Sequence, residues 1–340
     1  QIMSLKIFIL GANGFIGSHL SEAILAQTDW QIHAMDLAQD KIETCLQHPR
    51  FHFVSGDITK QKDWIRERIQ HCDVILPLVA VATPALYVQD PLRVFELDFE
   101  ANLEIVRQCA EYKKHVIFPS TSEVYGMCPD TEFDEENSNL VTGPINKERW
   151  IYSTSKQLLD RVIYAYGKHK GLSYTLFRPF NWYGPRLDNV FNPKPGGSRV
   201  LTQFIGNILR GENINLVNGG SQQRCFTYVG DGVDALLRII KNKNDSARNK
   251  IFNIGNPSEN ISIRKLAETL ISLITQSYPN YAERAKSVQL VDIDAQQYYG
   301  EGYQDVSLRV PLVRHANEQL GWTPQVSMET GLRATLDFYL

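Results

Sequence analysis

The sequence is poor in the features that mark secreted, metal-binding and membrane-spanning proteins. Its five cysteines are odd in number and form no Cys-x-x-Cys pair, which predicts reduced thiols rather than disulfides or a zinc site. The eight histidines show no metal-ligand spacing. The longest apolar stretch, 74–88, contains Pro77 and Pro84 and is shorter than the ~20 residues that a membrane helix needs. With no signal peptide before the first strand, these absences predict a cytoplasmic protein that binds neither a metal nor a membrane.

An excess of basic charge is also absent. The 340 residues carry a formal net charge of −3, so no positively charged face for nucleic acid is indicated. Hydrophobic residues make up 43% of the chain, which is enough for a large buried core. We therefore expect one large domain with a smaller lobe.

Strand-like and helix-like segments alternate regularly along the chain. This alternation predicts an α/β fold, in which a doubly wound parallel sheet of the Rossmann type carries helices on both faces. Ligands of such sheets bind at the carboxyl ends of the strands. The predicted strands are 5–10, 31–36, 51–54, 74–78, 115–119 and 173–178.

A glycine-rich loop follows the first predicted strand and leads into a helical pattern. Gly11 permits a tight turn, Gly14 lets a pyrophosphate approach the backbone, and Gly17 lets the helix pack on its strand. The N–H groups of the first helical turn then point at the phosphates. The spacing Gly-x-x-Gly-x-x-Gly is looser than Gly-x-Gly-x-x-Gly and is a weak signal by itself. The strand, the glycines, the helix and a following acid, Asp36, together predict a dinucleotide site.

Asp36 also indicates which dinucleotide binds. It ends the second strand, nineteen positions after Gly17, where a carboxylate can accept hydrogen bonds from the adenosine ribose. A carboxylate there repels the 2′-phosphate of NADP, and the nearest following cation is Lys41. NAD is therefore the expected cofactor. The loop residues expected to hold it are Gly11, Asn13, Gly14, Phe15, Ile16 and Gly17.

Side chains suited to proton transfer occur at two later places. Hydroxyls and a carboxylate follow the fifth strand, within 119–126. Tyr152 and Lys156 stand four apart at the start of a helical segment and so share one face. A nearby ammonium lowers the pKa of a phenol, which would let Tyr152 act as a base near neutral pH. Tyr-x-x-x-Lys is common by chance, but after a nucleotide loop and a Ser/Thr-bearing strand end it predicts a catalytic site.

Together these motifs resemble the extended short-chain dehydrogenase/reductase superfamily, whose members act on nucleotide sugars. Further matches to that superfamily lie at 177–186, 253–255 and 320–324. Within it, four longer strings resemble the UDP-glucuronic acid decarboxylase half of the bifunctional polymyxin-resistance enzyme. These strings are 79–84, 91–98, 149–152 and 302–306.

The resemblance implies a role for each matching residue. It implies that Tyr152 and Lys156 serve oxidation at the sugar C4 and also lie at the cofactor. It implies that Glu123 and Arg309 act in decarboxylation, with Ser122 beside them. The substrate contacts that it implies are Ala82, Tyr87, Thr121, Ser122, Arg149, Asn181, Arg224 and Tyr303. The further NAD contacts that it implies are Asp36, Asp57 and Ile58.

The chemistry agrees with these roles. Oxidation at C4 places a ketone beside the carbon that bears the carboxylate, so carbon dioxide can leave while its electrons enter an enolate. Arg309 would hold the carboxylate through a bidentate fork, and Glu123 would position it or manage a proton at C5. The alternatives are that Arg309 meets the nucleotide phosphates and that Glu123 is only a solvent-exposed strand end.

Some features leave the exact reaction open. The stretch 215–224 has fewer lysines than the family pattern and leaves Arg224 as its clear cation, with Arg199 expected to compensate as a substrate contact. Three functions therefore remain: a UDP-glucuronate decarboxylase yielding a 4-keto-pentose or UDP-xylose, a 4,6-dehydratase or 4-epimerase, and a silent NAD-binding regulator. Ser122-Glu123 in place of an Asp-Glu pair disfavours the dehydratase. The intact Tyr-x-x-x-Lys disfavours the regulator.

The expected domain division follows the same pattern. The NAD-binding domain should take 1–181 and about 227–256, and a smaller C-terminal α/β substrate lobe should take about 182–226 and 257–340. The nucleotide sugar would bind in the cleft between them. The resemblance also implies a homodimer through a helix bundle that includes the Tyr152 helix.

Overall fold

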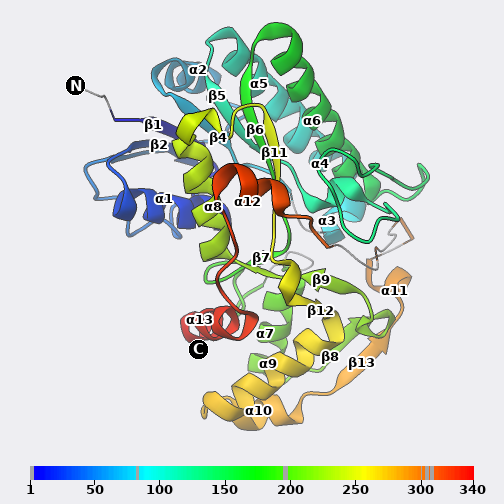
Figure 1. Cartoon of the computed structure of the whole chain (residues 1–340). Coiled ribbons are helices and arrows are strands. Elements are labelled where there is room, and N and C mark those ends of the chain that lie inside the picture. The colour runs from blue at the N-terminus through cyan, green and yellow to red at the C-terminus, as the bar shows by residue number, and fades with distance from the viewer. Residues whose placement is uncertain (1–3, 82–83, 194–197, 300, 303–305, 307–309) are drawn as a thin grey trace.

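The computed structural model describes residues 4–81, 84–193, 198–299, 301–302, 306 and 310–340. Its largest element is a seven-stranded sheet with every neighbouring pair parallel (Figure 1). Its strands, in spatial order, are β11 (Lys250–Ile254), β6 (Ser173–Pro179), β5 (His115–Pro119), β4 (Val74–Pro77), β1 (Lys6–Leu10), β2 (Gln31–Asp36) and β3 (Phe51–Ser55). The six predicted strands and the doubly wound α/β fold are confirmed, and β11 adds an edge beside β6.

Helices cover both faces of this sheet. The principal ones are α1 (Phe15–Gln27), α2 (Lys62–His71), α5 (Asn102–Glu111), α6 (Trp150–Lys170) and α8 (Val229–Lys241). In β1, Ile7 and Ile9 belong to the buried cluster of α1 and α8, whereas Phe8 and Leu10 belong to that of α2, α5 and α6. All four side chains are fully buried, because a parallel strand between two helical layers has no solvent face.

A second group of elements follows β6 and occupies the lower part of Figure 1. It contains three two-stranded pairs, of which one is antiparallel. These pairs are β7 (Trp182–Tyr183) with β10 (Thr227–Tyr228), β8 (Ile214–Val217) with β13 (Leu290–Ile293), and β9 (Gln223–Cys225) with β12 (Asn260–Ser262). The accompanying helices are α7 (Val200–Arg210), α9 (Ile263–Ser277), α10 (Ala282–Ser287) and α13 (Met328–Tyr339). The domain boundaries given above stay a prediction.

Shorter helices complete the fold. Those near the carboxyl edge of the sheet are α3 (Pro84–Gln89), α4 (Pro91–Phe95), the π-helix η1 (Glu96–Ala101) and the 3-10 helix η2 (Ser122–Tyr125). The others are η3 (Asn218–Gly220), η4 (Lys243–Asp245), η5 (Pro257–Glu259), α11 (Ala295–Tyr299) and α12 (Arg314–Leu320). The segments α4, η1 and α5 follow one another without a break, so the chain passes through one π turn between two α-helical stretches.

The described residues also bear on the absences noted in the sequence. No helix among them has both the length and the apolar character needed to cross a membrane. Within the same residues, no group of three or more His, Cys, Asp and Glu side chains is placed to hold a metal ion. All five cysteines are buried free thiols, and burial raises the pKa of Cys72 to about 12.

Candidate active site

The glycine-rich loop joins β1 to α1 at the carboxyl edge of the sheet. Gly11 has a φ of 88°, and a Cβ built on it would lie 3.1 Å from the Val79 nitrogen. A Cβ on Gly17 would lie only 2.4 Å from the Gly11 carbonyl oxygen, so α1 approaches the strand end as closely as glycine permits. No described side chain caps α1 at Gly14, which leaves the first-turn N–H groups open to an anion. The loop therefore fits the pyrophosphate of a dinucleotide.

Asp36 reaches this loop from the neighbouring strand β2. Its carboxylate accepts hydrogen bonds from the backbone N–H groups of Asn13, at 2.8 Å, and Leu37, at 2.7 Å. Burial raises the pKa of this carboxyl group. The Asn13 side chain in turn donates to Asp40 at 2.8 Å and accepts from the Lys41 N–H at 2.7 Å. Asp36 thus lies at the strand end where the predicted ribose contact requires it.

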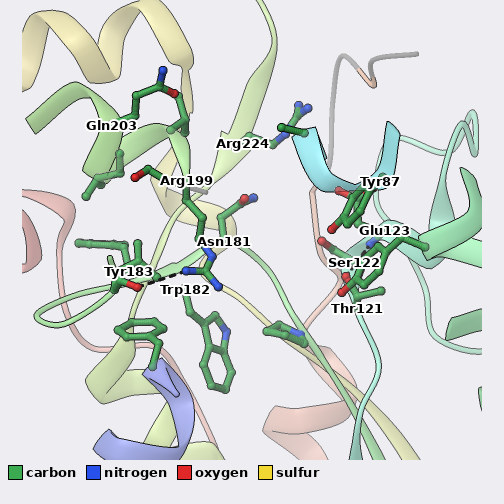
Figure 2. Close-up of a pocket in the computed structure, with 18 of the residues that line it drawn as sticks. Tyr87, Thr121, Ser122, Glu123, Asn181, Trp182, Tyr183, Arg199, Gln203 and Arg224 are labelled. Carbon is green, nitrogen blue, oxygen red and sulfur yellow. Dashed lines mark hydrogen bonds between the residues drawn. The ribbon is translucent and has the colours of Figure 1, made fainter. Parts of the chain in front are cut away.

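A cavity of about 780 Å³ extends from the glycine-rich loop toward the second group of elements (Figure 2). The predicted residues that line it are Gly11, Gly14, Phe15, Ile16, Gly17, Tyr87, Thr121, Ser122, Glu123, Arg149, Tyr152, Lys156, Asn181, Arg199 and Arg224. The predicted residues outside this lining are Asn13, Asp36, Asp57 and Ile58. Ala82, Tyr303 and Arg309 lie outside the described residues. Figure 2 shows one side of the cavity formed by Tyr87, Thr121, Ser122 and Glu123, and the opposite side by Arg199 and Gln203.

Asp57 and Ile58 follow β3, one strand further from the cavity than β2. The Asp57 carboxylate accepts hydrogen bonds from the Thr59 N–H and hydroxyl, at 2.8 and 2.7 Å, and these bonds lower its pKa. This side chain therefore organises its own turn. Contact of these two residues with NAD stays a prediction.

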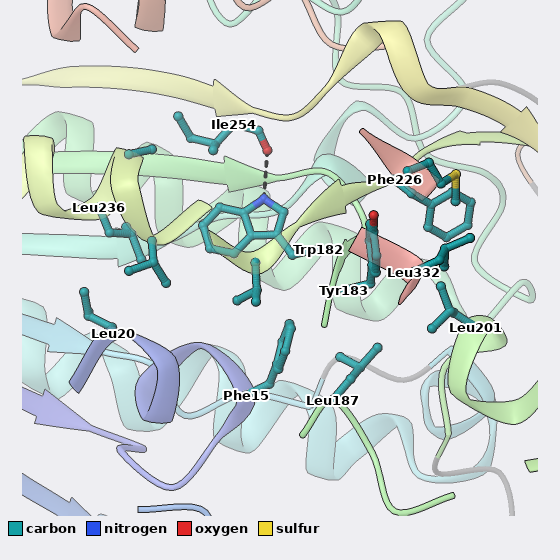
Figure 3. Close-up of a cluster of buried hydrophobic side chains, with 14 of the residues drawn as sticks. Phe15, Leu20, Trp182, Tyr183, Leu187, Leu201, Phe226, Leu236, Ile254 and Leu332 are labelled. Atoms are coloured by element: carbon teal, nitrogen blue, oxygen red, sulfur yellow. Dashed lines mark hydrogen bonds between the residues drawn. The ribbon is translucent and has the colours of Figure 1, made fainter. Parts of the chain in front are cut away.

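Asn181 is held on the cavity wall by the packing of its neighbours. It has a φ of 44°, and its carbonyl accepts a hydrogen bond from the Thr227 N–H at 3.1 Å. The next residue, Trp182, donates through its indole nitrogen to the Ile254 carbonyl at 2.9 Å and lies in the same buried cluster as Phe15 of α1 (Figure 3). The stretch 177–186, which the sequence singled out, thus packs the far wall of the cavity against the helix of the glycine-rich loop.

Tyr152 and Lys156 lie in the first turns of α6 and are 4% and 1% exposed. The Lys156 ammonium donates to the Pro119 carbonyl, at the end of β5, at 2.9 Å. The Tyr87 ring stacks on the Tyr152 ring with centroids 4.4 Å apart and planes 8° from parallel. The predicted pair is therefore brought together with the strand end that carries the hydroxyl side chains.

The pKa of Tyr152 differs from the expectation. The sequence predicted that Lys156 lowers it, but in the structure burial raises the pKa of this phenol and the negative charge of Asp98 raises it further. A hydrogen bond with Thr121 acts in the opposite direction. Helical spacing correctly placed the two side chains on one face, but it does not report how much water or which distant charges surround them.

Glu123 and Arg149 form a buried ion pair on the same wall, which the sequence did not predict. The Arg149 guanidinium donates a hydrogen bond to the Glu123 carboxylate. The side chain of Arg149 is 1% exposed and that of Glu123 is 11% exposed. The Arg149 guanidinium carbon also lies over the Trp150 ring, 4.5 Å from its centroid. The backbone N–H of Arg149 donates a hydrogen bond to the Gly302 carbonyl at 3.2 Å. Thr121 accepts from the Glu123 N–H at 3.1 Å and so caps η2. Glu123 is therefore not the solvent-exposed strand end considered as its alternative.

At the far end of the cavity, the two expected arginines, Arg199 and Arg224, both donate hydrogen bonds within the chain. The Arg199 guanidinium donates to the Asp188 carboxylate at 3.0 Å and to the Leu187 carbonyl at 3.3 Å. This ion pair counts against Arg199 compensating for the missing lysines. Arg224 is 8% exposed and donates to the Gln223 carbonyl at 2.7 Å.

Two further lining residues escaped the sequence reasoning because neither belongs to a motif. Gln203 on α7 donates a hydrogen bond to the hydroxyl of Tyr298 on α11, and both line the cavity. The contact joins elements that are 95 residues apart in the chain. No local signal could have paired them.

The parallel sheet, the loop that fits a dinucleotide, and the Tyr–Lys pair at the strand ends define a dinucleotide-dependent α/β enzyme. Residues 7–255 match the model of the NAD dependent epimerase/dehydratase family. The chain belongs to this family. NAD is thereby confirmed as the cofactor that Asp36 indicated.

Solved structures agree with this assignment. The chain is 54% identical to the PbgP3 protein from Burkholderia pseudomallei, with 99% of this chain and 96% of that chain covered and a TM-score of 0.90. UDP-glucuronic acid 4-epimerase from Bacillus cereus, solved with UDP-glucuronic acid and NAD, is 23% identical, with 98% of each chain covered and a TM-score of 0.80. The dTDP-glucose 4,6-dehydratase from Bacillus anthracis, solved with NAD, is 21% identical, with 99% of this chain and 96% of that chain covered and a TM-score of 0.78. The last two comparisons show a shared fold.

Proposed function

We propose that this chain is an NAD-dependent decarboxylase of UDP-glucuronic acid. The observation that carries the proposal is the buried Glu123–Arg149 pair, which places an acid on the cavity wall close enough to Tyr152 for its charge to act on the phenol. The resemblance of 79–84 and 302–306 to the decarboxylase half of the polymyxin-resistance enzyme supports the same assignment. A simple 4-epimerase needs no acid at this position.

The first half of the reaction is oxidation at C4. Tyr152 takes the proton of the C4 hydroxyl as a phenolate, which the Lys156 ammonium and the charge of an oxidised nicotinamide would favour against the burial that raises its pKa. Thr121 stabilises the phenolate through its hydrogen bond. The glycine-rich loop at Gly11, Gly14 and Gly17 would hold NAD, which would supply the acceptor for the C4 hydride. Lys156 holds a positive charge behind the phenol, fixed by its hydrogen bond to the Pro119 carbonyl. The sugar is then a β-keto acid.

The second half is loss of the carboxylate. The bond between C5 and the carboxylate carbon breaks and carbon dioxide leaves, while the electron pair of that bond enters the C4–C5 enolate. C5 then takes up a proton from solvent, and Glu123 manages this transfer. The Tyr152 hydroxyl, now protonated, can donate a hydrogen bond to the developing C4 oxyanion. Arg149 neutralises Glu123, so this acid can face the sugar without strongly repelling the uronate. Arg309, outside the described residues, keeps the carboxylate-holding role that the resemblance implies.

A combined assay tests the proposal. Enzyme, NAD and UDP-glucuronic acid are mixed, and carbon dioxide and NADH absorbance are followed together. Carbon dioxide with NADH indicates that the 4-keto-pentose is released, and carbon dioxide alone indicates internal reduction to UDP-xylose. If neither appears and a neutral nucleotide hexose is turned over instead, the chain is a 4-epimerase or 4,6-dehydratase and the proposal fails.

We also propose that the enzyme is a homodimer formed through a helix bundle that includes α6. Apolar side chains on this helix and on α4 face solvent in the single chain: Leu92 is 69%, Leu158 46% and Tyr164 53% exposed. Light scattering on the purified protein should give about twice the 38.7 kDa chain mass. A monomer mass at micromolar concentration would contradict this part of the proposal.

A further inference from the structure

Asp98 is a buried acid that the proposed mechanism does not use. Its side chain is fully buried, and no other described Asp or Glu shares that degree of burial. One carboxylate oxygen, Oδ1, accepts a hydrogen bond from the Val81 N–H at 2.8 Å. No described residue donates a hydrogen bond to the other oxygen, Oδ2. A buried carboxylate in this condition is unfavourable unless a positive charge lies close to it.

The local backbone fixes Asp98 in this position. It lies in η1, and π turns inside α-helices are rare and occur frequently at functional sites. The Asn102 side chain donates to the Asp98 carbonyl at 3.1 Å and to the Val79 carbonyl at 3.4 Å. These bonds tie the π turn to the chain that follows β4, and η1 packs directly against α6. The turn therefore holds Asp98 against the helix that carries the Tyr–Lys pair.

Lys156, on the helix that η1 packs against, is the positive charge that acts on Asp98. Burial raises the pKa of Asp98 to about 6, and the Lys156 ammonium opposes that rise. Conversely, burial lowers the pKa of Lys156, and Asp98 is the leading charge that opposes this change and so favours the ammonium form. Asp98 is also the leading charge acting on Tyr152, and it acts on Tyr87 in the same direction. The other charged groups on α4, η1, α5 and α6 are exposed, except for Asp160, which is buried and paired with Arg178. The exposed ones are Arg93, Glu96, Glu100, Glu104, Arg107, Glu111, Arg161, Lys168 and Lys170.

We infer that Asp98 is a positioning residue of the active site, whose carboxylate balances the buried Lys156 ammonium and sets how strongly Tyr152 holds a proton. The Lys156 ammonium and the positive charge of an oxidised nicotinamide would both favour the phenolate, against the burial that raises the pKa of Tyr152. The negative charge of Asp98 offsets one of the two. The inference concerns the Tyr–Lys chemistry and does not depend on whether the sugar is decarboxylated.

Tyrosine NMR tests this inference without any nucleotide sugar. The full chain is labelled with ¹³Cζ-tyrosine and titrated with NAD bound, and the Tyr152 resonance is assigned by its loss in Tyr152→Phe. Asp98→Asn removes a negative charge that opposes the phenolate, so the Tyr152 titration midpoint should fall by about one pH unit. Glu100→Gln removes an exposed charge from the same π turn and is the matched control, with no shift expected. An unchanged or higher midpoint in Asp98→Asn overturns the inference.

A second measurement uses the wild-type protein and so does not depend on how the variant folds. As Asp98 takes up its proton, the Tyr152 resonance should show a small step with a midpoint near pH 6. The step should be absent in Asp98→Asn and present in Glu100→Gln. A wild-type resonance with no step between pH 4.5 and pH 7.5 overturns the inference. Because no nucleotide sugar is present, failure of the decarboxylase assay and failure of this titration are separate results.

Discussion

The two ends of the cavity are formed by different kinds of groups, the backbone at one and charged side chains at the other. At the cofactor end, backbone groups and three glycines form the cradle, and Asp36 reaches it through a hydrogen bond to the backbone of Asn13. At the catalytic wall, buried charged side chains from separate segments face one another, as in the pair of Glu123 and Arg149. The cradle depends on close approach of the chain to itself, whereas the wall depends on charge compensation in the absence of water. Substitutions should therefore have different effects at the two ends: added volume should weaken NAD binding at the cofactor end, and loss of a charge should lower stability at the catalytic wall.

The largest effect is expected from Tyr152→Phe at the catalytic wall. Loss of the phenol removes the base for the C4 hydroxyl, so the rate of NADH formation should fall by about 10²–10⁴-fold. The thermal midpoint and NAD affinity should stay close to wild type, because the ring and its stacking on Tyr87 are kept. Tyr164→Phe, on the same helix but on the proposed dimer face and outside the cavity lining, is the control, because it removes a hydroxyl while keeping the ring. Wild-type turnover in Tyr152→Phe would remove this residue from the mechanism.

The next effect is expected from Arg149→Met, which leaves the Glu123 carboxylate buried without its guanidinium. The free energy of unfolding in urea should fall by about 3–5 kcal/mol. The double variant Arg149→Met/Glu123→Gln should recover part of that loss, since it removes the uncompensated charge. If the single and double variants are equally destabilised, charge compensation is not what stabilises the wall.

At the cofactor end, Gly17→Ala should weaken NAD binding by at least about tenfold and lower the free energy of unfolding by about 1–3 kcal/mol. The added methyl group would lie 2.4 Å from the Gly11 carbonyl oxygen and would force α1 away from the strand end. Calorimetry with NAD and urea unfolding measure the two effects. Gln27→Ala, at an exposed position on the same helix, should change neither. Normal NAD affinity in Gly17→Ala would show that the close approach is not required.

The same difference explains which parts of the site could be predicted from the sequence. The glycine-rich loop and six strands were predictable because each is specified by a few adjacent residues and their periodicity. Tyr152 and Lys156 were predictable because they are four apart on one helix. The pairing of Glu123 with Arg149 joins positions 26 apart in the chain. Asp98 acts on Lys156 only because η1 packs on α6. Such contacts, and the desolvation that raises the pKa of Tyr152, are properties of the folded chain.

The smallest effect concerns an ion pair between a histidine and a carboxylate away from the catalytic wall. His315 Nδ1 lies 3.6 Å from the Glu135 carboxylate, and this partner raises the pKa of the imidazole. The stabilisation is therefore fully present below pH 6.5, the ordinary value, and is lost as the pH rises through the raised pKa. The free energy of unfolding should fall by less than about 1 kcal/mol over that range.

The difference in slope between wild type and His315→Gln should isolate this contribution, because His19, His33 and His115, whose pKa values burial lowers, add a dependence of the opposite sign to both proteins. His169→Gln, at an exposed position on α6, should leave the wild-type slope unchanged. Urea unfolding at several pH values measures both. A difference between wild type and His315→Gln of zero or of the opposite sign would contradict the assignment.

Glu123→Gln gives the most direct test of the central claim, that the acid on the catalytic wall serves decarboxylation. Carbon dioxide release from UDP-glucuronic acid and the affinity for that nucleotide sugar are measured for the variant and for wild type under the same conditions. We expect carbon dioxide release to fall by about 10²-fold or more while the affinity for the nucleotide sugar changes little. A wild-type rate of carbon dioxide release in Glu123→Gln, or a loss confined to affinity, would contradict it.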